Sequence, residues 1–166
     1  PRTGSDGTGY ALAAALGHTI VAPVPALTPL TAADPLCVQL QGVTVDVELT
    51  LAVGGKRAET AHGSFLFAHF GYSGPAALDL SRSWLRAEGR DARAVNANFL
   101  PGETRESLLG AWQRETAPEP RLQVRHWLGR RLPDRLVLVL CAEAGVDAGA
   151  YASQTSRAHR AALAER

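Results

Sequence analysis

The sequence has no methionine, only two cysteines, a net charge of just +1, and aromatic residues at only 6%. Two cysteines are too few for a disulfide framework, and His18, His62, His126 and His159 have no metal-ligand spacing. No apolar run reaches the roughly 18 residues that cross a bilayer, and no signal peptide is visible. The small net charge excludes a global field that recruits nucleic acid or anionic lipid. We therefore expect a globular cytoplasmic protein with no metal, nucleic acid or membrane among its partners.

The chain begins with a glycine-rich segment, PRTGSDGTGY, that leads into an alanine-rich stretch. A helix is predicted over 10–16, where Ser5 or Asp6 accepts hydrogen bonds from the first turn and Gly17 ends the helix. No strand precedes the loop and no methionine starts the chain. We therefore expect a piece of a longer protein, with the strand that feeds the loop missing.

Alternating apolar and polar residues dominate the next part of the chain and predict antiparallel strands. Strands are expected over 36–41, 43–51 and 56–67, with Gly54-Gly55 as a hairpin turn, and a weaker one over 91–99. A helix is predicted over 76–88, with Ser73 as its cap, Pro75 in its first turn and Gly89 after its end. Several strands with one apolar face must close or stack, so a small barrel or sandwich follows.

After residue 101 the spacing of apolar residues becomes helical. Helices are expected over 103–116, 122–132 and 150–166. Residues 133–144 are ambiguous, because 136–140 have the composition of a buried strand, but a helix is favoured. Cys37 and Cys141 lie in apolar runs and are predicted to be buried, reduced thiols. The larger aromatic residues are predicted to be core or interface residues: Tyr72, Trp84, Trp112 and Trp127.

Three segments are candidates for chemistry. The first loop, with Gly4, Gly7 and Gly9, precedes a helix N-terminus, where free amides favour anions, but its spacing is not that of the dinucleotide fingerprint. A tight structural loop is therefore the favoured interpretation there. In the second segment, 67–75, Ser73 lacks the nucleophile-elbow pattern and is expected to be a helix cap. His69 in that segment is either a site residue at a strand end or a structural histidine.

The third candidate is a basic segment of the helical part. Its members are Arg121, Arg125, His126, Trp127, Arg130, Arg131 and Arg135. Phosphate binding is one interpretation of this segment. Because acidic residues lie nearby and the net charge is near zero, a solvated or interdomain face is favoured.

Together the two loops resemble one family, the conserved bacterial NAD(P)/FAD-dependent oxidoreductases that include aminoacetone-oxidase-like and bile-acid-pathway flavin reductases. The resemblance is carried by PxTGSxGxGY at 1–10, LGH at 16–18, PxLxPL at 25–30, FxHxGxSGPxxL at 67–78, and Ser81. The family usually has threonine where this chain has Ala68, so a hydroxyl role at that position is lost or is not essential. The match runs in order through nearly the whole chain.

The resemblance implies the fold class: α+β, with a small antiparallel β-barrel and a helical subdomain inserted in a split FAD-binding Rossmann domain. It implies a loop, helix and proline-rich connection over 1–34, the barrel with one helix over 35–100, and the helical subdomain over 101–150. Residues 151–166 are then a helical segment that leads back to the missing domain.

The resemblance also implies a function. The chain is expected to be the cap that covers the flavin and shapes the substrate pocket, while the parent is an NAD(P)/FAD-dependent oxidoreductase. FAD belongs to the parent; the isolated chain is expected to bind none and to be inactive. The implied partners are the missing Rossmann domain, a small-molecule substrate, and NADH, NADPH or oxygen. The flavin- or substrate-facing residues are expected to be Thr3, Gly4, Ser5, Gly7, Gly9, Gly71, Ser73 and Gly74, with His69 as the catalytic candidate. The competing hypothesis is a non-catalytic barrel module that binds RNA or a protein.

Overall fold

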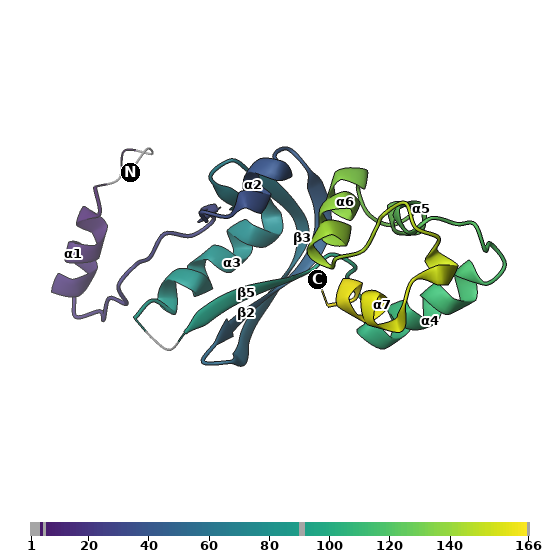
Figure 1. The fold of residues 1–166 in the computed structure, drawn as a ribbon. Coiled ribbons are helices and arrows are strands. Elements are labelled where there is room, and N and C mark those ends of the chain that lie inside the picture. Colours follow the sequence, from purple (N-terminus) through teal and green to yellow (C-terminus); the bar gives the residue numbers. More distant parts are fainter. Residues whose placement is uncertain (1–3, 5, 90–91, 166) are drawn as a thin grey trace.

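A computed structural model describes residues 4, 6–89 and 92–165 of the chain (Figure 1). The strands in this part are β1 (Leu30–Thr31), β2 (Thr44–Val53), β3 (Lys56–Ala68), β4 (Gly71–Ser73) and β5 (Arg93–Asn98). The helices are α1 (Thr8–Ala15), α2 (Pro35–Gln39), α3 (Pro75–Arg86), α4 (Arg105–Thr116), α5 (Val124–Gly129), α6 (Asp134–Glu143) and α7 (Arg157–Leu163), with a 3₁₀-helix η1 (Ala152–Gln154).

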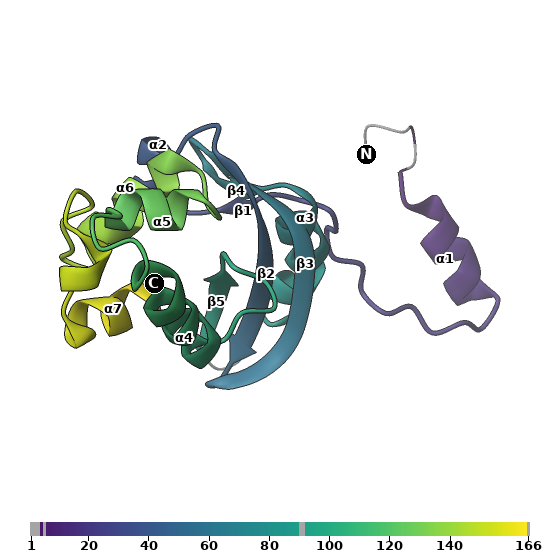
Figure 2. The ribbon, with the colours of Figure 1, turned by 90° about the vertical axis from the view of Figure 1, so that its right-hand side faces the viewer.

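The strands form one antiparallel sheet in the order β1-β4-β3-β2-β5. The sheet is strongly curved (Figure 2), and α3 and α4–α7 lie toward opposite ends of it (Figure 1). The result is an open half-barrel with a helical subdomain, so the predicted α+β class with an antiparallel barrel is confirmed.

The hairpin of β2 and β3 is the longest element of the sheet and has the predicted position. Gly54 and Gly55 form its turn with φ of 58° and 75°, a left-handed backbone that glycine adopts without strain. Along β2 the buried residues Val47, Leu49 and Leu51 alternate with more exposed ones. This alternation buries one face of the sheet and leaves the other polar.

Helix α3 packs on the buried face of the sheet, with Ala76, Ala77 and Leu80 fully buried. It has Pro75 in its first turn, as predicted. The predicted capping role of Ser73 is wrong, because the N-cap is Gly74 and no side chain caps the helix. Gly74 has φ 89°, and a Cβ there would lie 2.6 Å from the carbonyl oxygen of Ser64. The close approach of two backbones therefore requires glycine at this position.

The strand predicted over 36–41 is wrong, because this segment forms the short helix α2. Asp34 is the N-cap, and its Oδ1 accepts a hydrogen bond from the Leu36 amide at 2.9 Å. The buried residues are Cys37 and Leu40. They are three residues apart, which is the spacing of a helix face and not of a strand.

The helical subdomain confirms the predicted helices α4 and α5, and it shows that 134–143 is helical. A capping box between Thr104 and Ser107 starts α4. The single helix predicted over 150–166 is wrong in part, since η1 precedes a shorter α7 that starts at a Ser156 cap. The break follows from the extended backbone of Thr155, which has φ −66° and ψ 128°.

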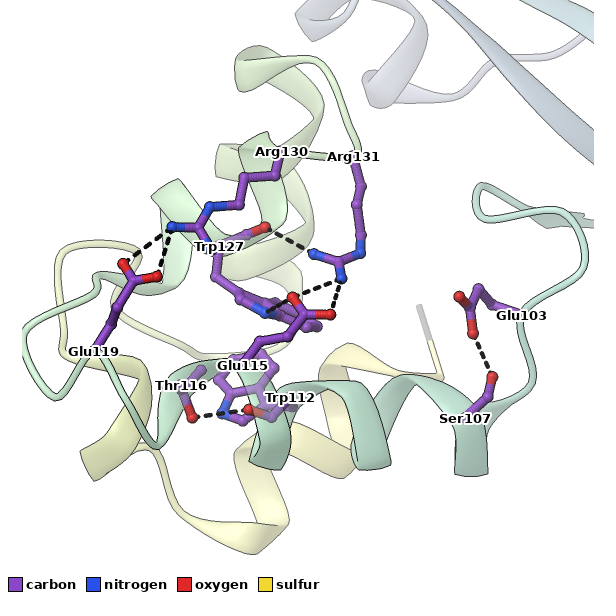
Figure 3. Close-up of polar contacts among 9 residues, drawn as sticks. All are labelled: Glu103, Ser107, Trp112, Glu115, Thr116, Glu119, Trp127, Arg130 and Arg131. Carbon is purple, nitrogen blue, oxygen red and sulfur yellow. Dashed lines mark hydrogen bonds and ion pairs between the residues drawn. The ribbon is translucent and has the colours of Figure 1, made fainter.

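Two tryptophans form the centre of this subdomain, with ring centroids of Trp112 and Trp127 at 4.5 Å. The Trp127 indole donates to Glu115 at 2.9 Å, and Arg131 donates to both oxygens of the same carboxylate at 2.6 and 2.7 Å (Figure 3). The Arg131 guanidinium also lies over the Trp127 ring, at 4.6 Å from its centroid. This network joins α4 to α5 across the loop between them.

Candidate functional site

The turn between β3 and β4 lies at the segment that the sequence analysis selected. His69 is exposed there, and its ring contacts Phe70 edge to face with centroids at 5.0 Å. Gly71 is buried with φ 140°, and a Cβ at this position would lie 2.1 Å from the Leu30 carbonyl oxygen. Ser73 pairs with Leu66 in the sheet. Gly71 therefore lets β4 pass close to β1, and Gly74 lets it pass close to β3.

Tyr72 is the side chain that this turn contributes to the barrel interior. Its ring stacks on Phe65 with centroids at 5.1 Å and meets Phe67 edge to face at 5.8 Å. Phe67 in turn stacks on Phe99 at 6.3 Å. Four aromatic rings from strands β3 and β4 and the segment after β5 thus form one continuous wall.

The polar end of this wall is a hydrogen bond between Tyr72 and Asp34. The Tyr72 hydroxyl donates to Asp34 Oδ2 at 2.5 Å, while Oδ1 of the same carboxylate caps α2. Burial, this hydrogen bond and the nearby Cys37 thiol raise the pKa of Tyr72 well above its usual value of 10. The hydroxyl therefore stays protonated and fixes the orientation of the ring.

A cavity of about 210 Å³ opens along the aromatic wall, at the gap between the edge strands β1 and β5. It is lined by Leu30, Thr31, Ala32, Leu36, Leu49, Phe65, Phe67, Tyr72, Trp84, Val95, Ala97 and Phe99. We call this space the lumen. A second cavity of about 150 Å³ shares Leu36, Phe67 and Phe99 with it and extends to α6. A mostly apolar pocket with few polar groups is the usual form of a small-molecule site.

The first glycine loop is separate from the lumen. Thr3 and Ser5 lie outside the described residues, and Gly4 and Gly9 are exposed. Helix α1, which follows the loop, has no buried residue and stands apart from the sheet in both views (Figures 1 and 2). Within this chain the two glycine-bearing segments are therefore not brought together.

The described residues do not fit a FAD-binding site of their own. The start of α1 is occupied by the Asp6 carboxylate, which accepts from the amide and hydroxyl of Thr8 at 2.9 and 2.6 Å. These bonds lower the pKa of Asp6, so a negative charge lies where a pyrophosphate would need free amides. Every strand pair of the described residues is antiparallel, so this part of the chain offers no parallel pair beside a glycine loop.

In the described part of the chain, no group of three or more His, Cys, Asp or Glu residues could hold a metal ion. Among the same residues, no helix is long and apolar enough to cross a membrane. Cys37 and Cys141 are both free and buried, as predicted.

Sequence reasoning selected the turn at 69–74 but missed the residues that shape the lumen. The sequence predicts Tyr72 only as a core or interface aromatic residue. Asp34 was not selected at all, although Asp-Pro at 34–35 is a recognisable helix start. No sequence signal links these two residues, which are 38 positions apart and meet only in the folded chain.

The family model named HI0933-like protein barrel and H2TH domain matches residues 24–166. One relative, ribosomal RNA dihydrouridine synthase of Haemophilus influenzae, is 28% identical over 139 residues, which are 82% of this chain and 32% of the relative. The Escherichia coli protein of the same name is 31% identical over 137 residues, 82% of this chain and 32% of that protein. The 3-dehydro-bile acid delta(4,6)-reductase of Clostridium scindens is 28% identical over 136 residues, which are 81% of this chain and 33% of that protein.

The chain therefore spans about a third of the length of the curated relatives it matches. Its half-barrel and helical subdomain agree with the two parts that the family model names. Since the model covers most of the sequence, the chain belongs to the HI0933-like family, which is associated with FAD-dependent oxidoreductases.

Proposed function

We propose that this region is the cap of a FAD-dependent oxidoreductase whose FAD-binding Rossmann domain is elsewhere in the same polypeptide. The observation that carries the proposal is the lumen, a preformed aromatic cavity in a chain of a family associated with such enzymes. The described residues do not fit FAD themselves, so the contribution of this region is to cover the reaction site, exclude water and orient a substrate.

The lumen is suited to a flat, unsaturated ring. Its volume of about 210 Å³ exceeds that of engineered apolar cavities, about 150 Å³, that hold benzene. Phe65, Phe67 and Phe99 offer ring faces and edges for stacking. The Tyr72 hydroxyl, held by Asp34, is the polar group beside them.

The names of the relatives support a reductive reaction. Two are named for making dihydrouridine in ribosomal RNA and one for reducing a bile acid. We propose that the whole protein reduces an unsaturated ring, either a free small molecule or a base within RNA, with NADH or NADPH as the electron source. The proposed location is the cytoplasm, where both buried thiols stay reduced.

The turn at 69–74 and the first glycine loop are the parts that we propose face the flavin domain. His69 is exposed three residues before the lumen wall residue Tyr72, so it is free to contact a neighbouring domain. Gly71 and Gly74 keep the backbone of the turn close to the sheet. Unchanged turnover and an unchanged flavin spectrum in a His69→Ala variant would show that His69 does not have this role.

The test uses the full-length protein. Its visible spectrum is expected to show bound flavin that NADH or NADPH bleaches in the absence of oxygen. Reoxidation is then measured with ribosomal RNA and with ring-shaped enones as acceptors. A preparation that folds and carries no flavin refutes the proposal.

The contribution of the lumen is tested by Tyr72→Phe, with Thr50→Val as the control. Thr50 lies on the opposite face of β2 from the lumen residue Leu49, so its hydroxyl is not in the cavity. We expect Tyr72→Phe to keep its flavin and to lose substrate turnover, while the control behaves as wild type. Equal turnover in both variants would exclude the Tyr72 hydroxyl from the reaction.

A further inference from the structure

The basic segment of the helical subdomain divides into two groups of arginines. Arg131 is paired with Glu115, and Arg130 with Glu119, the latter at 3.0 and 3.2 Å (Figure 3). These pairs occupy Glu115 and Glu119, two of the three acidic residues beside the segment; the third, Asp134, is in none of the ion pairs of the described residues. The charge of each of the two arginines is therefore balanced locally.

The remaining cations of the segment have no such balance. Arg121 and Arg125 are exposed, and neither has a carboxylate within ion-pair distance in the described part of the chain. His126 is exposed beside them and shares a surface hollow with Arg121. Glu119 lines the same hollow but pairs with Arg130. Asp147, next to the Ala148 carbonyl that accepts from the Arg125 amide, directs its carboxylate to the Gly149 amide at 2.8 Å. Positive charge thus accumulates locally although the whole chain carries only +1.

An exposed aromatic ring lies in the same surface. Tyr151 forms an isolated antiparallel bridge with Gln123, and its side chain is 40% exposed. Arg125 Nε donates to Gln123 Oε1 at 2.9 Å, which holds the guanidinium near this bridge. We define Arg121, Gln123, Arg125, His126 and Tyr151 as the basic–aromatic patch.

The patch is rigidly built. The segments that carry it are joined by backbone bonds from Ala152 to Leu122 at 2.8 Å and from Val124 to Ala150 at 3.0 Å. The Trp112 indole donates to the Ala152 carbonyl at 3.1 Å, and the Ser153 hydroxyl donates to the Pro120 carbonyl at 2.7 Å. The arginines and the tyrosine are therefore presented on a preorganised surface, which lowers the entropic cost of binding.

We propose that the basic–aromatic patch binds a single-stranded segment of RNA. Guanidinium groups neutralise phosphates, and an exposed tyrosine ring stacks on an unpaired base. A lipid surface fits less well, because Tyr151 is the only large apolar residue of the patch that is exposed among the described residues. This inference rests on the RNA form of the proposed function and departs from the expectation, based on net charge, that no nucleic acid binds.

The test measures binding of a short fluorescein-labelled single-stranded RNA to the full-length protein between about 50 and 200 mM KCl. Removing two phosphate contacts by Arg121→Gln/Arg125→Gln should reduce the slope of log K against log[KCl] by about 1.4. Tyr151→Leu should weaken binding about fivefold or more with the slope unchanged. The charge-matched control is Lys56→Gln/Arg57→Gln at the β2–β3 hairpin, where two exposed cations are also removed.

An unchanged slope in the Arg121/Arg125 variant, or an equal change in the hairpin control, overturns the inference. Thermal unfolding of each variant is measured first, so that only folded protein enters the comparison. Flavin absorbance of the same samples separates the two proposals. Bound flavin without a patch effect refutes only the RNA site, and a patch effect without flavin refutes only the oxidoreductase.

Discussion

Gly71→Ala is expected to detach β1 from the sheet. A Cβ at Gly71 would lie 2.1 Å from the Leu30 oxygen, 2.8 Å from the Ala32 nitrogen and 2.9 Å from Thr31 Cα, all of them backbone atoms of the β1 segment. A side chain cannot rotate away to relieve these contacts, so the strand itself must move. The β1–β4 pairing, the contact of Leu30 with the lumen and the Tyr72 position are then lost together.

Gly63→Ala is the matched control, because Gly63 has φ 134° and Gly71 has φ 140°. A Cβ at Gly63 would make ordinary contacts, 3.7 Å from Pro75 Cβ and 3.9 Å from the Ala76 amide nitrogen. Both variants should therefore share the backbone strain of this φ region, about 1–3 kcal/mol. Only Gly71→Ala adds the steric clash.

The additional loss of stability in Gly71→Ala comes from the contacts that β1 no longer makes. About two sheet hydrogen bonds contribute about 1 kcal/mol each, and a half-buried leucine contributes about 1 kcal/mol more. We expect Gly71→Ala to be about 2–4 kcal/mol less stable than Gly63→Ala, which is roughly 4–15 °C in Tm for a chain of this size. Urea and thermal unfolding followed by circular dichroism measure the difference. Equal stability of the two variants would refute the steric reasoning.

Two further substitutions and one labelling experiment test other parts of the structure. Glu115→Ala should cost about 1–3 kcal/mol, because it leaves the buried Trp127 indole without an acceptor, whereas Glu119→Ala at an exposed ion pair should cost less than about 1 kcal/mol in urea unfolding. The bonds from Arg131 and, to a smaller extent, Trp127 lower the pKa of Glu115, so the stability they add is complete above its usual 4.5 and is lost as the pH falls below that value. This loss should be absent from Glu115→Ala. Tyr72→Phe should cost about 1 kcal/mol below pH 10 and should remove a phenol that resists deprotonation above pH 10 in an absorbance titration. Burial raises the pKa of Cys141 to about 11, so its thiol should resist alkylation in mildly alkaline buffer until urea unfolds the chain; fast native labelling would contradict this.

The elements that the sequence predicted well are those with local signals. Gly54-Gly55 requires a left-handed backbone, and Pro75 is suited to the first turn of a helix, so the hairpin and α3 have their predicted places. The segment 36–41 shows the opposite case. Its residues alternate as in a strand, but a short apolar run does not decide between helix and strand, and the Asp34 cap settles it as α2.

The candidate site was predictable only in part, because only some of its features have a local sequence signal. The turn at 69–74 has a recognisable pattern of glycine, serine and proline. The bond between Tyr72 and Asp34 joins distant residues, and its existence depends on the order β1-β4-β3 in the sheet. Roles of the glycine loops toward the flavin domain stay predictions.

The sequence by itself determined the local choices: where turns occur, which residues alternate into the core, and that the second half of the chain is helical. These follow from backbone preferences and periodicity within a few residues. Tertiary structure alone decided which aromatic rings surround the lumen. It also decided which arginines are neutralised by Glu115 and Glu119, while Arg121 and Arg125 form no ion pair among the described residues. Packing and charge pairing depend on distances between residues that are far apart in the chain, and only the fold sets those distances.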